Sequence, residues 1–152
     1  MNKQVKEALH VSIDIKWKEP SGQNGEIKPK WFHYTKTQTN LKPFYKQIIE
    51  EGKYKILIYN GDVDTAVPTN GAANWTSSLG FDVYPDENWR PYTTDGQMDM
   101  CGYITIYETL KNFTFATVRG AGHMVPQYKP RQSLTLIKNF VLDIPYPRYS
   151  YS

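Results

Sequence analysis

The chain of 152 residues contains a single cysteine, and this scarcity limits its disulfide chemistry. A disulfide from Cys101 would have to reach another chain or a further part of the same one, and the alternative is a free, buried thiol. The sequence also lacks an apolar run of the roughly 18 to 20 residues that a membrane helix needs. We therefore expect no transmembrane span.

A strong charge of either sign is absent as well. Eighteen basic against 15 acidic residues leave a net charge of +3, which is too weak to indicate a nucleic-acid or membrane partner. Aromatic residues make up 14% of the chain, which is more than a disordered tail would carry. We expect a packed protein whose length suits one domain or a piece of a larger one.

The signals for export disagree. Residues 1–6 are polar and lack the apolar segment of a secretory signal, so the chain taken literally is not exported. Two glycosylation sequons indicate the opposite, with Asn74 in Asn-Trp-Thr and Asn112 in Asn-Phe-Thr. We expect Asn74 and Asn112 to be glycosylation sites of a protein whose exported part begins upstream, with chance occurrence as the alternative.

Hydrophobic periodicity predicts an alternation of helices and strands. The first part is predicted to contain a short amphipathic helix at 3–10, an extended segment at 11–17 and a loop at 19–29. Next come a helix from Pro43 to Gly52 with Phe44 and Ile48 on its apolar face, a strand at 56–59 buried on both faces, and a helix at 68–79. The rest comprises loops with a hairpin arm at 81–102, strands at 103–107 and 113–118, and a helix from Pro130 with Leu134, Ile137 and Val141 at helical intervals. This order is that of the last units of a doubly wound α/β sheet.

Two loops that follow predicted strands carry the residues best suited to chemistry. One contains Asp62 and Asp64, and the other contains His123. Open α/β sheets place ligands and catalytic groups at the carboxyl ends of their strands. A carboxylate and an imidazole are two members of a Ser/His/Asp relay, and here the aspartates precede the histidine, as in α/β-hydrolases.

Each of these residues also has a structural interpretation. An aspartate beside a glycine commonly hydrogen-bonds the backbone of its own turn. We assign the turn to Asp62, which adjoins the glycine, and the catalytic role to Asp64, which is freer to project. For His123 the alternative is an ordinary loop histidine, but its glycine-rich surroundings favour a projecting ring. His10 and His33 lack such a setting and are interpreted as structural or exposed.

The nucleophile of such a relay is missing. None of the serines lies in a Gly-x-Ser-x-Gly elbow between a strand and a helix. The two aspartates and the distant His123 lack the spacing of a zinc or EF-hand site, so no metal is expected. Glycine-rich phosphate loops are absent too, and no cofactor is expected.

The two loops together resemble the serine carboxypeptidase family, close to its cathepsin A, or lysosomal protective protein, type. The resemblance is carried by Ile-Leu-Ile-Tyr-Asn-Gly-Asp-Val-Asp at 56–64 and by Phe-Thr-Phe-Ala-Thr-Val-Arg-Gly-Ala-Gly-His-Met-Val-Pro at 113–126. The second string is highly specific and matches the family's histidine motif. Residues 5–10 and 130–132 are similar to further family segments, so only 19–29 and the last few residues are not covered.

The resemblance implies that the chain is the C-terminal portion of an α/β-hydrolase fold. It also implies an enzyme that removes single residues from peptide C-termini at acidic pH, in the lysosome or after secretion. It makes Asp64 the triad acid, His123 the general base, and Met124 a wall of the pocket for an apolar leaving residue. The family's nucleophilic serine and oxyanion hole lie N-terminal to this region and have no counterpart here. Family cysteines are also missing after Trp17 and after the acidic motif, which puts the family's disulfides in question.

Three hypotheses follow. The chain is the C-terminal part of a two-part enzyme whose partners are its N-terminal half, a peptide substrate and a second copy in a homodimer. Alternatively, it is a truncated, inactive relative that binds a partner, or an unrelated small α/β binding domain. Packing favours the first, because the strand at 56–59 needs parallel neighbours and only 113–118 supplies one.

Overall fold

The computed structural model describes residues 3–8, 10, 12, 14, 40–96 and 99–149. The chain divides into two units, 1–39 and 40–152. The first unit contains helix α1 (Lys3–Ala8), which confirms most of the short helix predicted there. The predicted loop at 19–29 and almost all of the predicted extended segment at 11–17 lie outside the described residues.

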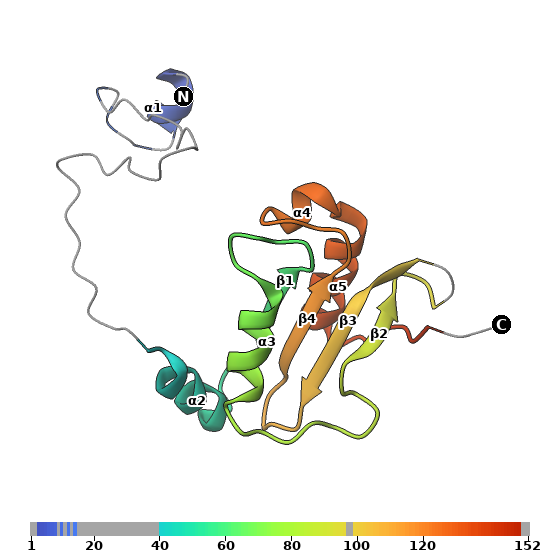
Figure 1. The fold of residues 1–152 in the computed structure, drawn as a ribbon. Helices are drawn as coiled ribbons and strands as arrows, with labels where there is room; N and C mark the ends of the chain where they lie inside the picture. The colour runs from blue at the N-terminus through green and yellow to red at the C-terminus, as the bar shows by residue number, and fades with distance from the viewer. Residues whose placement is uncertain are drawn as a thin grey trace. The chain divides into compact units, whose positions relative to one another are not determined.

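The second unit alternates helices and strands (Figure 1). Its elements are α2 (Lys42–Glu51), β1 (Ile56–Gly61), α3 (Thr69–Ser77), β2 (Arg90–Thr93), β3 (Met100–Tyr107), β4 (Phe113–Val118), α4 (Val125–Tyr128) and α5 (Pro130–Leu142). The predicted helices and strands are confirmed, with ends that differ by a few residues. Two short elements are additional: β2 lies in the segment predicted as loops with a hairpin arm, and α4 follows the His123 loop.

The four strands form one mixed sheet in the order β1-β4-β3-β2. Strands β1 and β4 run parallel, whereas β4, β3 and β2 are joined by antiparallel pairing. The register pairs Gly61 with Val118 at the last residue of each parallel strand. The loops that follow β1 and β4 therefore leave the sheet side by side, and this places the two candidate loops together (Figure 1).

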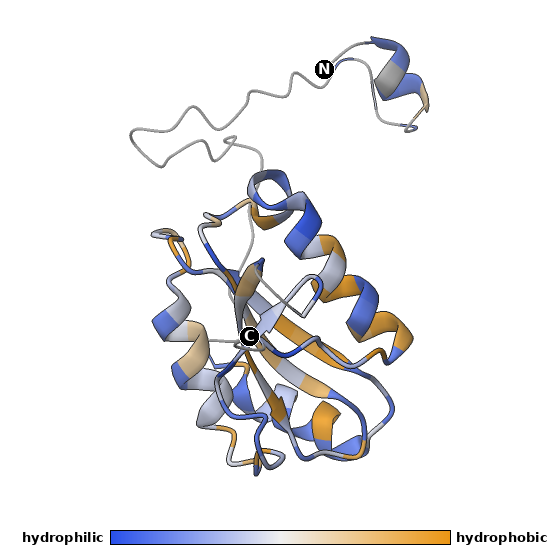
Figure 2. Ribbon diagram, turned by 90° about the vertical axis from the view of Figure 1, so that its right-hand side faces the viewer, coloured by the Kyte–Doolittle hydropathy of each residue, from blue (hydrophilic) through white to orange (hydrophobic). Residues whose placement is uncertain are grey.

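Strand β4 divides its side chains between two cores. Phe113 and Phe115 pack with residues of α2 and α3, including Ile49, on one face of the sheet. Ala116 on the other face belongs to the core that contains Leu136 of α5. The alternation follows from the two-residue period of a strand. Hydrophobic residues accordingly gather in the central strands, between the helices (Figure 2).

Two predicted apolar faces differ from those observed in detail. In α2, Phe44 is 57% exposed, and the inward face is formed by Ile49 with the half-buried Ile48. In β1, Ile56–Gly61, the first three residues are half-buried instead of buried on both faces. The reason is topological, since β1 ends the strand order and has a neighbouring strand on one side within the described residues.

Helix α5 turns its predicted apolar stripe outward. Its three stripe residues, Leu134, Ile137 and Val141, are all exposed. The buried positions are Ser133, Leu136 and Asn139. Both polar side chains are satisfied locally: the Ser133 hydroxyl donates to the Lys129 carbonyl at 2.7 Å, and the Asn139 amide donates to the Pro145 carbonyl at 3.2 Å. The helix therefore presents an apolar surface to its surroundings.

Three further findings concern membrane spans, the cysteine and metal ligands. None of the described helices combines the length and the hydropathy needed to cross a bilayer. Cys101 lies in β3 as a fully buried free thiol, in agreement with the second of its two interpretations. The part of the chain that is described also holds no group of three or more metal-ligating side chains.

Candidate active site

The loop after β1 holds the carboxylate of Asp64 in a fixed orientation. Its Oδ1 accepts hydrogen bonds from the backbone amides of Ala66 at 2.8 Å and Val67 at 3.1 Å. The loop is braced at both ends, because the Asn60 amide donates to the Val67 carbonyl and the Thr69 hydroxyl donates to the Gly61 carbonyl. The side chain of Asp64 is only 5% exposed. The second oxygen, Oδ2, is left to contact another group.

That group is His123. The Nδ1 atom of its imidazole lies 3.0 Å from Oδ2 of Asp64, across 59 residues of sequence. The imidazole itself is 61% exposed, so the ring reaches out from the loop while its Nδ1 edge is held. Within the described part of the chain, Nε2 of His123 has no hydrogen-bond partner. The two loops therefore bring together the carboxylate and the imidazole that the sequence singled out.

The electrostatics of the pair define its protonation. The hydrogen bond from His123 is the largest cause that lowers the pKa of Asp64 below its ordinary value of 3.8, with the Val67 and Ala66 amides adding to it and desolvation opposing it. An ionised carboxylate only accepts hydrogen bonds, so Nδ1 of His123 carries the donated hydrogen. In the neutral ring the lone pair then lies on Nε2, the atom that a general base uses.

Asp62 has a different partner from the one that the sequence indicated. Turn chemistry predicts a hydrogen bond to its own loop, whereas its Oδ1 accepts from the amide of Gly120 at 2.6 Å. Gly120 belongs to the other loop, 58 residues away. Asp64 is the aspartate that binds amides of its own loop. The turn assignment for Asp62 is thus incomplete, because residue spacing does not reveal an acceptor across two loops.

A cavity of about 350 Å³ lies beside the pair. It is lined by both Asp64 and His123, together with Tyr59, Val67, Val125 and Pro126. Tyr59, Asn60 and Gly61 of β1 contribute to the lining as well. Space for a reacting group therefore exists next to the histidine.

The remaining predicted residues lie around the site or away from it. Met124 adjoins His123 and is 57% exposed, but it does not line the 350 Å³ cavity. Asn74 is exposed on α3. Asn112 precedes β4, is half-buried, and its Oδ1 accepts a hydrogen bond from the Thr114 hydroxyl. His10 is exposed, whereas His33 lies outside the described residues.

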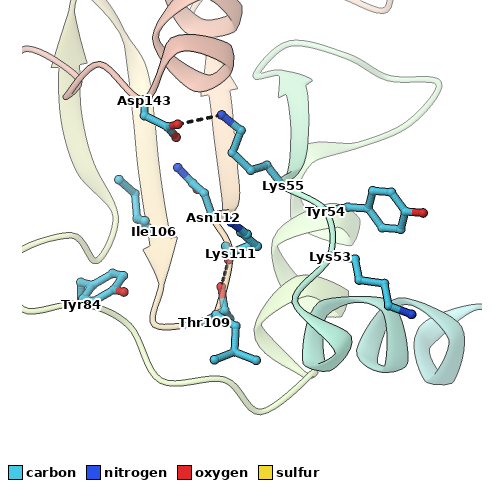
Figure 3. A pocket seen from close by; sticks show the side chains of 10 residues that line it. Lys53, Tyr54, Lys55, Tyr84, Ile106, Thr109, Lys111, Asn112 and Asp143 are labelled. Atoms are coloured by element: carbon cyan, nitrogen blue, oxygen red, sulfur yellow. Dashed lines mark hydrogen bonds and ion pairs between the residues drawn. The ribbon is translucent and has the colours of Figure 1, made fainter.

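A larger cavity, of about 580 Å³, lies at the opposite ends of β1 and β4 (Figure 3). Lys55 and Lys111 line it just before these strands begin. The Lys55 ammonium is already bound to Asp143 at 3.0 Å and to the Val141 carbonyl at 2.8 Å, so it serves to cap α5 (Figure 3). We assign the candidate site to the smaller cavity because that one contains an oriented acid and base.

Sequence reasoning missed the groups that orient the two side chains. These groups are the backbone amides of Ala66, Val67 and Gly120 and the bracing side chains of Asn60 and Thr69. An aspartate commonly accepts hydrogen bonds from the backbone amides two and three residues later in a turn. This rule, applied to Asp64, would have pointed to Ala66 and Val67. No local signal identifies Gly120, because its partner is distant in sequence.

A family profile and individual relatives of known name both match this chain to serine carboxypeptidases. The sequence profile of the serine carboxypeptidase family (Peptidase S10) matches residues 1–143. "Serine carboxypeptidase 1" of Hordeum vulgare is 40% identical over 98 residues, which are 64% of this chain and 18% of that protein. "Serine carboxypeptidase 24" of Arabidopsis thaliana is 34% identical over 145 residues, or 95% of this chain and 29% of the relative.

The chain is much shorter than these proteins. "Serine carboxypeptidase-like 32" of Arabidopsis thaliana, 33% identical over 143 residues, is likewise matched over 94% of this chain but 29% of its own length. The chain therefore spans less than a third of each of these three relatives. The observed mixed sheet with helices on both faces is consistent with a partial α/β-hydrolase fold. The family match covers nearly the whole sequence, and on that ground the chain belongs to the serine carboxypeptidase family.

Proposed function

We propose that this chain supplies the acid and the base of a serine carboxypeptidase, with Asp64 as the triad acid and His123 as the general base. The observation that carries the proposal is the 3.0 Å hydrogen bond between Asp64 Oδ2 and His123 Nδ1 at the ends of two adjacent parallel strands. This bond fixes the ring and its tautomer, which is the role of the aspartate in a Ser/His/Asp relay.

In the proposed reaction, Nε2 of His123 takes the proton of a serine hydroxyl as that oxygen attacks the last peptide bond of the substrate. The same atom returns the proton to the amine of the departing residue, which leaves the acyl group on the serine. Water, deprotonated by Nε2, then attacks this ester, the shortened peptide leaves as a carboxylic acid, and the serine oxygen regains its proton from the imidazolium. Asp64 stays ionised throughout and stabilises the imidazolium. Its lowered pKa favours this role at acidic pH. Met124 is proposed to contact the leaving residue and to favour apolar ones.

The serine is proposed to come from a preceding part of the enzyme, so that residues 1–152 form the C-terminal part of an α/β-hydrolase domain. Two surfaces support this partner. Strand β1 has one edge without a neighbour among the described residues, and α5 exposes Leu134, Ile137 and Val141. An open strand edge and an apolar helix stripe are the features that further strands and helices cover. By itself, the chain is proposed to be inactive.

We also propose that the protein acts in an acidic compartment, lysosomal or secretory, as expected for a cathepsin A-like enzyme. The support is the sequon at Asn74, whose side chain is exposed on α3 and so available for a glycan. Fractionation of cells with an antibody against the chain tests the compartment. A cytosolic signal without glycan would contradict this proposal and leave the catalytic one standing.

The test of the catalytic proposal compares two proteins. One is the 152-residue chain, and the other is the same chain joined to the part of the Arabidopsis relative "Serine carboxypeptidase 24" that it does not span. Both are assayed at acidic pH for release of the last residue from a blocked dipeptide. We expect activity in the joined protein alone, and a loss of about 10⁴-fold or more in its His123→Ala variant.

The matched control is Asp82→Ala, which removes an exposed aspartate away from the site and should leave the activity unchanged. A folded but inactive joined protein would contradict the proposal. That outcome would favour the second hypothesis, an inactive relative that binds a partner. Retained activity in His123→Ala would also contradict it, because the base would then lie elsewhere.

A further inference from the structure

The His123 loop is attached to the acid loop at more than the catalytic pair. Beyond the end of the β1 and β4 pairing, the amide of Asp62 donates to the Val118 carbonyl at 3.2 Å and the amide of Val63 donates to the Ala121 carbonyl at 3.2 Å. These are contacts between backbone groups, which any residue would make. Among the described residues, the carboxylate of Asp62 makes the one further side-chain hydrogen bond between the two loops besides that of Asp64 and His123, and it accepts this bond from the amide of Gly120.

This contact is short and charged. The distance between Oδ1 and the amide nitrogen is 2.6 Å, shorter than the usual N–H···O separation of about 2.9 Å. Hydrogen bonds to an ionised carboxylate are about twice as strong as neutral ones. Gly120 has a φ of 68°, a left-handed conformation that turns the chain toward His123 three residues later. A bond at this residue restrains the bend from which the imidazole projects.

We infer that Asp62 is a positioning residue, whose carboxylate holds the Gly120 turn so that His123 keeps its place against Asp64. The inference rests on the proposed function for its catalytic consequence. The two aspartates of the motif then have separate roles: Asp64 orients the imidazole ring directly, and Asp62 orients the backbone that carries the ring. A glycine turn with an exposed amide would otherwise be free to pivot about the remaining backbone contacts.

The direct test uses the 152-residue chain and requires no activity. Hydrogen exchange reports the protection of the Gly120 amide, and the ¹⁵N and ¹H signals of His123 Nδ1 report the bond to Asp64. In Asp62→Ala we expect exchange at Gly120 to accelerate about tenfold and the Nδ1–H signal to broaden or shift. The side chain of Asp62→Ser is too short to reach Gly120, so this variant should show the same faster exchange and the same change of the Nδ1–H signal. It replaces the alanine variant if that protein does not fold.

Two further variants separate this role from a general structural one. Asp62→Asn retains a carbonyl oxygen that accepts from Gly120, so it should restore most of the protection and of the Nδ1–H signal. Asp82→Ala removes an exposed aspartate elsewhere and should change neither signal. Unchanged Gly120 exchange and an unchanged Nδ1–H signal in Asp62→Ala would overturn the inference.

The catalytic consequence is measured in the joined enzyme. We expect Asp62→Ala to lower kcat about tenfold with KM nearly unchanged, because a displaced base affects the reaction more than substrate binding. An unchanged kcat would overturn the positioning role. If the unmodified joined enzyme is inactive, the proposed function fails, and the exchange and Nδ1–H measurements alone decide whether Asp62 positions His123.

Discussion

Gly61 and Ala121 approach so closely that a Cβ atom on Gly61 would lie 2.1 Å from the carbonyl oxygen of Ala121. The same Cβ would lie 2.5 Å from the Ala121 carbonyl carbon and 2.5 Å from the Gly122 carbonyl oxygen. All three atoms belong to the backbone, so no side-chain rotation could relieve the contact. The absence of a side chain at position 61 is therefore what lets the acid loop and the histidine loop meet.

The first prediction concerns this contact. Gly61→Ala should push the two loops apart, destabilise the protein by about 1 to 3 kcal/mol, and abolish most of the activity of the joined enzyme. Urea unfolding and the dipeptide assay measure the two effects. Gly71→Ala is the matched control, because no atom lies within 4 Å of its new Cβ and helix α3 should gain about 0.5 to 1 kcal/mol. Equal stabilities for the two variants would contradict the prediction.

The second prediction is a pH dependence of stability that depends on Asp64. Its pKa is lowered in the folded state from the ordinary 3.8, so the pair stabilises the protein above that value. This stabilisation should be lost as the pH falls through 3.8 and on through the lower folded pKa. The free energy of unfolding of Asp64→Asn should therefore differ from wild type most at about pH 5 and above, and least in strong acid.

Unfolding by urea between pH 3 and pH 7 provides this measurement, within the range where carboxylates titrate. Asp82→Asn serves as the control, because it removes an exposed aspartate carboxylate away from the Asp64–His123 pair. A constant difference for Asp64→Asn over the whole range would show that its carboxylate is not stabilised by His123.

The third prediction concerns Cys101. Burial in β3 raises the pKa of its thiol to about 12, with Asp99 adding to the shift. At pH 8 an exposed thiol of ordinary pKa should react with iodoacetamide about a thousandfold faster than this one. Mass spectrometry of the alkylated protein, with and without urea, measures the difference. Rapid alkylation in the native chain would show that Cys101 is accessible.

The fourth prediction concerns three charged side chains at the start of β2, where Glu87 contacts two arginines. Glu87 binds Arg90 and Arg148, each at 2.6 Å, and the side chains of Glu87 and Arg90 are 16% and 11% exposed. Glu87→Ala should destabilise the protein by about 2 to 4 kcal/mol, because it leaves a mostly buried arginine without its anion. Thermal and urea unfolding measure this change.

The matched control for Glu87 is Glu50→Ala, which breaks an exposed pair with Lys46 at 3.9 Å. Such a surface pair should contribute less than about 1 kcal/mol. Similar losses for the two variants would indicate that burial does not set the strength of the Glu87 contacts.

The fifth prediction concerns the two sequons. Asn74 is exposed, whereas Asn112 is half-buried and hydrogen-bonded to Thr114. After expression through a secretory pathway, native protein should lose its Asn74 glycan to a glycosidase faster than any glycan at Asn112. Peptide mapping by mass spectrometry gives both rates, and Asn74→Gln is the control. Faster release at Asn112 would contradict the observed exposure of these side chains.

The sequence predicted the elements of the second unit well because their signals are local. An apolar run before Gly61 indicated β1, and the motif ending in His123 indicated the end of β4. Side-chain faces were predicted less well. The sequence placed Leu134, Ile137 and Val141 of α5 at helical intervals, and the structure shows that this stripe is exposed while Ser133 is buried. Periodicity reports that a helix has an apolar side, but not which partner covers it.

For the candidate site, the sequence by itself determined which residues are proposed to carry the chemistry. Asp64 and His123 each follow a strand that was recognisable from its own residues, and the order of acid before base is a property of the chain. Only the tertiary structure decided that β1 and β4 are adjacent and parallel, which brings these side chains within 3.0 Å of each other. It also decided the close approach of Gly61 to Ala121 and the hydrogen bond from Gly120 to Asp62, because contacts between loops about 60 residues apart are set by tertiary packing.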